Sequence, residues 1–528
     1  LPATTKALVV SSPSNGLVMD GSWKEASDMM AVMATGAKGV HFLALQGFVD
    51  PDGAYALVHV EHGAEVPMTG MDANQGGATP WADFDAAQAK LIKTVEDETA
   101  AAVRPAYDAG AAEAQAKKLT VNFARTAPHF AFGFGSHAYH DSAIKALMNV
   151  VGVELPVAGG GAGQPGMPGA VISKEPGAAP KVSAIGKSAM GFVLCWPTVH
   201  VAGAFCSGLT PEEDGSCHGV VTKTAGLHVI NEIDGEPAFD VYRRWLGDGA
   251  FSDEMIESLL KKSKAGESLL PPGMYSSEQM YGSGYLGMME LMQYFMDGAE
   301  GTSDEKTMAE NLAAARVAQQ KDALNKDFKQ LKPLGLVVGE SDGDEYHKVA
   351  FPIAFGTVDK TLYSLVGVEE GQKVTIMNGK SADARERTAR LAKQVLRTAG
   401  FDIGSLAGSF SYNCAMYQML GGPNAMQACA EKLADVLGDC PTLGMLGGPE
   451  YGTMGDGCQS AVGSYMFSTI VFSTVPIDTP MHKGTTFASG AADGVGSSML
   501  MNRAGSVLVD DNVRSERESK MSSRTGGA

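Results

Sequence analysis

The sequence has no excess of basic residues, no long apolar run and no regular pairing of cysteines. Asp and Glu outnumber Lys and Arg by 60 to 41, which gives a formal net charge of −19. Because nucleic acids and anionic membranes attract clustered Lys and Arg, this charge argues against both as partners. No run of about 18 apolar residues occurs, so the sequence predicts no membrane-spanning helix.

The seven cysteines do not form the pattern of a disulfide framework. Their number is odd, the chain is 528 residues long, and no two cysteines are separated by two residues. This usage is typical of a reducing compartment. The Leu1-Pro2-Ala3 start resembles the mature end that plastid import leaves in algae with complex plastids. We therefore expect the cytoplasm or the plastid stroma.

Apolar residues and glycine are abundant. The hydrophobic content of 44% excludes a disordered chain, and the 65 glycines follow no three-residue period, which excludes collagen. Segments in which apolar residues alternate as in a strand are interspersed along the sequence with segments in which they recur at helical spacing. Together these features predict an α/β protein with mixed sheets flanked by helices.

Start and stop signals define the expected elements. We expect helices at 83–103, 106–118, 142–150, 237–245, 252–263, 303–329, 382–399 and 424–437. Strands are expected at 7–10, 39–46, 54–60, 119–123, 153–158, 190–206, 227–233, 334–338, 346–355, 374–377, 408–414, 442–447 and 463–474. The second and third strands are expected to form a hairpin. Pro105 is expected to break the first helix, and 159–185 to be a loop.

Two glycine motifs match enzyme signatures only in part. Residues 339–343 fit the GxSxG pattern of hydrolases, but an alternating β-like run follows where the nucleophile elbow needs a helix. We interpret Ser341 as part of a hairpin turn. Residues 161–166 fit GxGxxG, but Pro165 and Pro168 exclude the helix that would bind a pyrophosphate. We expect no catalytic residue and no cofactor.

The histidines and acidic turns do not reach the ligand count of a metal site. His137 and His140 are three residues apart, with His129 and Asp141 nearby, whereas structural zinc needs four ligands. Asp342, Asp344 and Glu345 lack the spacing of a calcium loop. We expect no bound metal.

The C-terminal part resembles the FIST C-terminal domain over 334–473. The resemblance is carried by five segments: Tyr346 to Phe355, Val368 to Val374, Phe410 to Cys414, Gly444 to Gly452, and the upstream block Val229 to Gly247 with Ile233 to Ala238. Residues 85–210 resemble the FIST N-terminal domain more loosely. The resemblance implies a sensory module that binds small ligands such as amino acids.

One departure from the family pattern affects the expected ligand. FIST domains usually follow their cysteine with Gly-Arg, whereas Cys414 is followed by Ala415 and Met416. An arginine there would suit a ligand carboxylate. Its absence counts against amino-acid binding and leaves open a scaffold that has lost its ligand.

A crossover argument places a candidate ligand site. A helix separates the strands 408–414 and 442–447, so both are expected to be parallel neighbours whose carboxyl ends share one edge. Ligands bind at such edges. The candidate ligand-binding residues are Tyr412, Asn413, Cys414, Gly448, Glu450 and Tyr451. Packing in the core is the alternative for each of them.

The sequence thus predicts four regions and leaves three functions open. The regions are an N-terminal extension with a β-hairpin at 1–80, a FIST N-like domain at 81–225, a FIST C-like domain at 226–483 with a helical insertion at 252–330, and a flexible Gly/Ser-rich tail at 484–528. We expect a non-catalytic sensory or regulatory module that binds small molecules and proteins. The alternatives are a self-assembling scaffold or shell protein, such as one of an algal pyrenoid, and an unrecognised enzyme. Met288, Met289, Met292 and Met296, at helical spacing, favour the scaffold.

Overall fold

The structure is a computed structural model of the whole chain. It describes residues 7–11, 17–19, 22–24, 52–63, 81–119, 127–136, 139–152, 155–161, 170–174, 177–179, 181–183, 188–212, 215–247, 253, 285–287, 332–341, 344–356, 359–379, 381–414, 425–453 and 460–477. The expected helix 303–329, the strand 39–46, the methionine group and the C-terminal tail lie outside these residues, as does the expected helix 252–263 apart from residue 253. No helix of the described part is long and apolar enough to cross a membrane.

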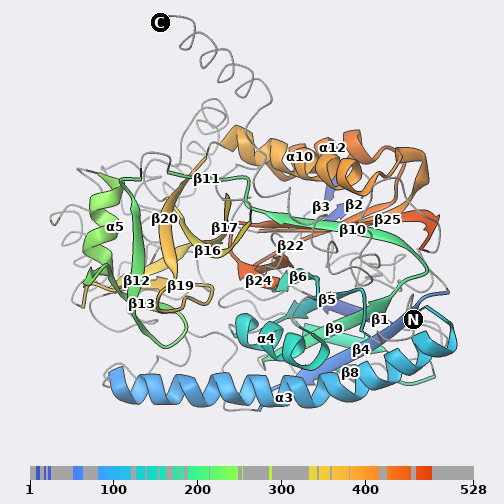
Figure 1. Cartoon of the computed structure of the whole chain (residues 1–528), viewed down its shortest axis with the longest axis horizontal. Coiled ribbons are helices and arrows are strands. Elements are labelled where there is room, and N and C mark those ends of the chain that lie inside the picture. Colours follow the sequence, from blue (N-terminus) through green and yellow to red (C-terminus); the bar gives the residue numbers. More distant parts are fainter. Residues whose placement is uncertain are drawn as a thin grey trace, which may run out of the picture.

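Two six-stranded sheets pack face to face in the centre of the molecule (Figure 1). The upper sheet has the order β10 (Val199–Cys206), β25 (Phe467–Pro476), β21 (Leu406–Cys414), β22 (Thr442–Gly447), β2 (Leu17–Met19) and β3 (Ser22–Lys24). The lower sheet has the order β24 (Ser460–Gly463), β23 (Glu450–Thr453), β6 (Val157–Gly161), β5 (Phe130–Gly135), β9 (Ala189–Trp196) and β4 (Ala54–Glu61). Aromatic rings join them: the centroids of Phe132 and Phe410 are 5.1 Å apart.

Helices cover the outer face of each sheet, which gives four layers (Figure 1). α3 (Trp81–Ala116) and α4 (His140–Val151) lie on the lower sheet, and α10 (Ser381–Ala399) and α12 (Ala425–Leu437) lie on the upper one. The short helix η2 (Ile403–Ser405) precedes β21. This arrangement confirms the expected class of mixed sheets flanked by helices.

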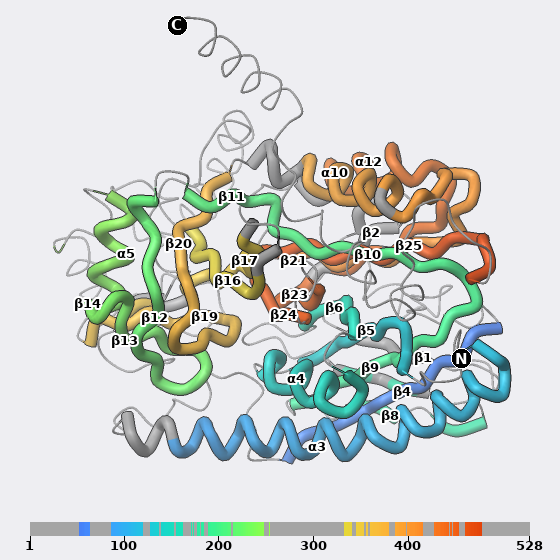
Figure 2. Tube along the Cα trace, in the orientation of Figure 1, coloured from blue at the N-terminus to red at the C-terminus, as the bar shows by residue number. Residues whose placement is uncertain are grey.

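Both halves of the sandwich use the same order of elements. α3, β5, α4 and β6 repeat as α10, β21, α12 and β22, and in each half the two strands are parallel neighbours. The chain then changes sheet, because β10 follows β9 into the upper sheet and β23 follows β22 into the lower one. Figure 2 traces the first of these passages at the right in green. Strands on either side of residue 225 therefore share sheets.

The two sheets meet closely where β6 approaches the turn between β22 and β23. The Gly161 N–H donates to the Pro449 carbonyl at 2.7 Å, and the Gly448 N–H donates to the Gly161 carbonyl at 3.0 Å. A Cβ added at Gly160 would lie 2.1 Å from the Tyr412 ring. Only glycine lets the backbone approach this closely.

A third sheet of ten strands lies beside the sandwich (Figure 1). Its main path is β15 (Tyr285–Gly287), β18 (Pro352–Gly356), β19 (Leu362–Ser364), β13 (Val229–Ile233), β12 (His218–Ala225), β20 (Lys373–Asn378), β16 (Leu334–Ser341) and β17 (Asp344–Ala350). β11 (Thr210–Pro211) pairs with β20, β14 (Glu236–Pro237) pairs with β13, and α5 (Ala238–Leu246) contacts β13. A small sheet of β1 (Ala7–Ser11), β7 (Ala170–Lys174) and β8 (Lys181–Val182) completes the described part.

The expected break at Pro105 is wrong, because α3 continues through it to Ala116. Pro105 lies on the exposed side of the helix, where water can bond the carbonyl that loses its partner. Beyond the proline, Ala111 and Ala114 are buried and the Tyr107 ring stacks 6.5 Å from Trp196. This packing on the lower sheet holds the last turns in place.

Three other expectations change or gain detail. The expected loop at 159–185 contains the end of β6 together with β7 and β8. Trp245 packs against the core and is mostly buried, as expected, beside the fully buried face of α5, which consists of Ala238, Phe239, Val241 and Tyr242. The hairpin interpretation of 339–343 is confirmed, since β16 and β17 pair up to Ser341 and Asp344.

Candidate functional site

The crossover argument for the predicted site is confirmed in its geometry. β21 and β22 are parallel neighbours, and Cys414 pairs with Gly447 at their carboxyl ends. A Cβ added at Gly448 would lie 3.4 Å from Glu450 Oε1 and 3.9 Å from Cys414 Sγ. The structure therefore brings Cys414, Gly448 and Glu450 together at one edge of the upper sheet.

Glu450 is a fully buried acid at this edge. Its Oε2 accepts a hydrogen bond from the Met466 N–H at 2.7 Å, and Oε1 has no hydrogen-bond partner among the described residues. Burial raises the pKa of Glu450 to about 8, although the Met466 amide, the Cys414 thiol and the Arg387 charge each act to lower it. The carboxyl group is thus mostly protonated at neutral pH.

The remaining candidates form hydrogen bonds within the protein. The Tyr412 hydroxyl donates to the Gly161 carbonyl, and burial holds its pKa well above the usual range. The Asn413 side-chain oxygen accepts from Arg387. The Tyr451 hydroxyl meets His140 Nδ1 inside the lower sheet's core. These three side chains are buried and each has its partner within the protein.

Arg387 was not among the residues singled out from sequence. It is fully buried on α10, and its Nη1 donates to the carbonyls of Ser207 at 2.9 Å and Tyr465 at 3.0 Å. The guanidinium also lies 4.9 Å from the Tyr465 ring centroid. Arg387 precedes the buried Leu391 by four residues, so helical spacing places both on the same inner face of α10. This spacing could have identified Arg387 from the sequence.

The histidines expected in a polar loop differ in their surroundings where the structure describes them. His140 is buried on α4, whereas His129 is partly buried in the bend before β5. Desolvation lowers the pKa of His140 to about 3 and of His129 to about 4. His137 lies outside the described residues. No cluster of three or more metal-binding side chains occurs in the described part of the chain.

A cavity of about 460 Å³ lies elsewhere, between the sandwich and the ten-stranded sheet. Its lining comes from α3, α4, β16, β17, β24, the turn between β12 and β13, and the turn before β20. The lining residues are Ile92, Glu96, Asp141, Ser142, Ile144, Lys145, Met148, Leu227, Val337, Val338, Lys348, Glu369, Glu370, Gly371, Gln372, Ser460, Ala461 and Val462. The volume is in the usual range of small-molecule sites.

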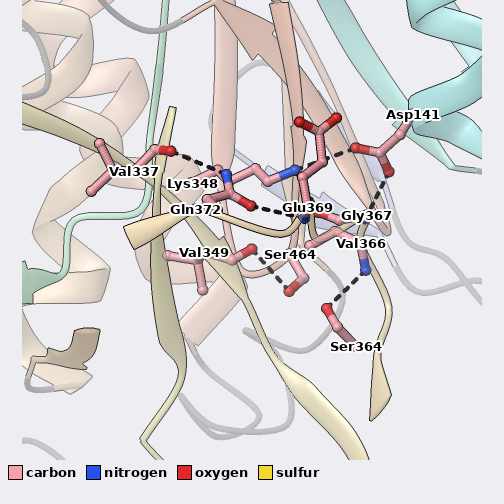
Figure 3. A network of polar contacts seen from close by, with 10 residues as sticks. All are labelled: Asp141, Val337, Lys348, Val349, Ser364, Val366, Gly367, Glu369, Gln372 and Ser464. Carbon is pink, nitrogen blue, oxygen red and sulfur yellow. Dashed lines mark hydrogen bonds and ion pairs between the residues drawn. The ribbon is translucent and has the colours of Figure 1, made fainter. Parts of the chain in front are cut away.

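At one wall of this cavity a polar network joins the sandwich to the ten-stranded sheet (Figure 3). The Lys348 ammonium donates to the Gly367 carbonyl at 2.7 Å and to Asp141 Oδ1 at 3.4 Å. The Gly367 N–H donates to Asp141 Oδ2 at 2.9 Å. The first turn of α4 is thereby connected to β17 and to the segment after β19.

The second wall of the cavity is held by the turn before β20. Gln372 donates from its amide nitrogen to the Val337 carbonyl at 3.0 Å and accepts from the Glu369 N–H at 3.3 Å (Figure 3). The Thr224 N–H donates to Glu370 Oε1 at 3.0 Å. The turn that carries both glutamates is therefore positioned by hydrogen bonds from β12 and β16. None of the six predicted site residues lines this cavity.

Comparison with known proteins identifies one domain in the C-terminal half. Residues 309–453 match the family model of the FIST C domain, a domain associated with sensory and signalling proteins. The match covers β16 to β23 and so includes Lys348, Glu369, Cys414 and Glu450. It confirms the resemblance over these residues, whereas the resemblance of 85–210 to the FIST N-terminal domain stays a prediction. No curated protein matches the chain.

Proposed function

We propose that this protein is a non-catalytic sensory or regulatory module that binds a small organic molecule in the cavity between the sandwich and the ten-stranded sheet. The observation that carries the proposal is the position of the 460 Å³ cavity. One wall, with Lys348 and Glu369, belongs to the FIST C match, and the opposite wall belongs to α3 and α4. An occupant would touch both, so its binding free energy would bias their arrangement.

The groups at the cavity support binding rather than catalysis. The ammonium of Lys348 and the carboxylate of Asp141 are bonded to each other and to the Gly367 backbone. A nucleophile or general base needs a reactive group that faces the substrate with a second group to activate it. The two charges act here as a connection across the cavity wall.

The predicted site at Cys414 and Glu450 is a less favourable place for a ligand. Tyr412, Asn413 and Tyr451 already have partners within the protein, and Cys414 and Glu450 are almost fully buried. We therefore assign the binding role to the cavity and a structural role to this edge.

The scaffold alternative gains little from the described surface. The exposed large hydrophobic side chains there are Val182 on β8 and Ile403 on η2, which belong to separate elements. A self-assembling face needs a contiguous apolar patch. The described cysteines occur as thiols, which supports the reducing compartment proposed for this protein.

Ligand stabilisation with a cavity-blocking variant tests the proposal. Ala461 lines the cavity from β24, so Ala461→Trp fills it with a ring. Val182→Trp adds the same ring at an exposed site and serves as the control. Compounds from a metabolite panel are expected to stabilise the wild-type protein and the control by about 2.7 kcal/mol at 100 times Kd. Equal stabilisation of Ala461→Trp would contradict the proposal.

A further inference from the structure

We propose that the cavity selects a small organic cation, namely an amine with an apolar body and an uncharged hydrogen-bond acceptor. This inference rests on the proposed function, because it names the class of ligand that the same cavity takes. Three features of the lining carry it: the balance of charge, an incompletely bonded ammonium group, and an apolar surface.

Both cations that line the cavity are already neutralised by a carboxylate. Lys145 Nζ lies 3.5 Å from Glu96, and Lys348 Nζ lies 3.4 Å from Asp141. No other Lys or Arg of the described residues lines the cavity. An anionic ligand would therefore find no unpaired positive charge there.

Two further carboxylates line the cavity without an ion-pair partner among the described residues. Glu369 and Glu370 follow each other in the turn before β20. Glu370 accepts a hydrogen bond from the Thr224 N–H, which carries no charge. The lining therefore has a net charge of −2, and it attracts an ammonium group more than a neutral or anionic one.

The Lys348 ammonium indicates where a ligand acceptor would lie. It has three N–H donors, and the described residues supply two acceptors, the Gly367 carbonyl and Asp141. Its side chain is only 9% exposed and lines the cavity. A buried donor without an acceptor is costly, so a ligand oxygen that bonds it is favoured. Because Asp141 already balances the charge of Lys348, an uncharged hydroxyl or amide fits better than a carboxylate.

Apolar side chains supply the rest of the surface. Ile92, Ile144 and Met148 come from the helices, and Val337 and Val462 come from β16 and β24. An aliphatic body between the amine and the acceptor would bury apolar area against them, at roughly 25 cal/mol per Å². The three features together describe an amino alcohol or an amino amide with a carbon chain.

A matched series of three probes tests this class by calorimetric titration of the full-length protein. The probes are 6-amino-1-hexanol, a cation, 6-aminohexanoic acid, a zwitterion, and 1,6-hexanediol, which is neutral. They share a six-carbon body and differ in charge. We expect the amino alcohol to bind about tenfold more tightly than either of the others, with an affinity that falls as salt concentration rises.

Substitution of the two unpaired glutamates supplies the second arm. Glu369→Gln combined with Glu370→Gln is expected to weaken amino-alcohol binding about tenfold and to leave diol binding unchanged. Glu431→Gln, at an exposed position on α12, is the matched control with no expected change. Unaltered binding in the double variant would contradict the role assigned to these carboxylates.

The outcomes separate this inference from the proposed function. Equal or tighter binding of the zwitterion or the diol, or no binding by any probe, overturns the cationic class. If such a probe binds the wild type but not Ala461→Trp, the cavity remains the site and only the class is wrong. Binding that persists in Ala461→Trp, and in Val338→Trp as a second blocking variant, overturns the function of the cavity itself.

Discussion

Glu450 is expected to make the stability of this protein fall as the pH rises through the neutral range. The carboxyl group is fully buried in the folded chain, and its pKa there is about 8, against 4.5 without the protein environment. Between these two pH values the folded chain holds the proton and the unfolded chain has released it. Folding then takes up a proton, so each pH unit across this window removes about 1.4 kcal/mol of stability. Below pH 4.5 and above pH 8 the contribution is constant.

Glu450→Gln removes this titration while keeping the shape of the side chain. The Gln oxygen can still accept the hydrogen bond that the Met466 N–H donates to Oε2. Between pH 5.5 and pH 7.5 the stability of the wild type relative to this variant is expected to fall by about 2.7 kcal/mol. Urea unfolding at the two pH values measures the change, with Glu431→Gln as the exposed control. Parallel pH profiles of wild type and Glu450→Gln would refute the argument from burial.

Three further substitutions test other parts of the account. Gly160→Ala places a methyl group against the Tyr412 ring and is expected to lower the stability by about 3 kcal/mol. The control is Gly404→Ala, whose methyl group would have no neighbour within 4 Å and is expected to change the stability little. Urea unfolding measures both changes. Lys348→Met leaves the Asp141 carboxylate without its ion pair and is expected to lower the free energy of unfolding by about 2 kcal/mol. In a double-mutant cycle, adding Asp141→Asn is expected to restore part of that loss. Ser341→Ala is expected to change the stability by under about 0.5 kcal/mol and to leave the rate of ester hydrolysis unchanged. If an ester-hydrolysis assay shows activity in the wild type that Ser341→Ala abolishes, the hydrolase interpretation is restored.

Local patterns were sufficient where an element depends on its own residues. The helices at 382–399 and 424–437 and the strands around them were predicted closely, because caps, glycine stops and alternation all agree there. The parallel pairing of β21 with β22 also followed from the crossover rule. The break predicted at Pro105 does not occur, because packing of α3 on the lower sheet offsets the local cost of a proline inside the helix.

The candidate cavity could not be predicted in the same way. Its lining is assembled from segments as distant in sequence as Ile92 and Val462, and no local motif marks any of them. Asp141 was noted only as a neighbour of two histidines, whereas its partner Lys348 is 207 residues away. Pairing between such distant residues depends on how the ten-stranded sheet meets the sandwich. The sequence patterns of the separate strands and helices do not contain that information.

A crystal structure of the protein soaked with 6-amino-1-hexanol would show whether an amine binds in the cavity between the sandwich and the ten-stranded sheet. We predict an ordered ligand in the cavity, with its hydroxyl at the Lys348 ammonium, its carbon chain against Met148, and its ammonium group at Glu369 or Glu370. A ligand ordered only outside this cavity, for example beside Cys414, would contradict it.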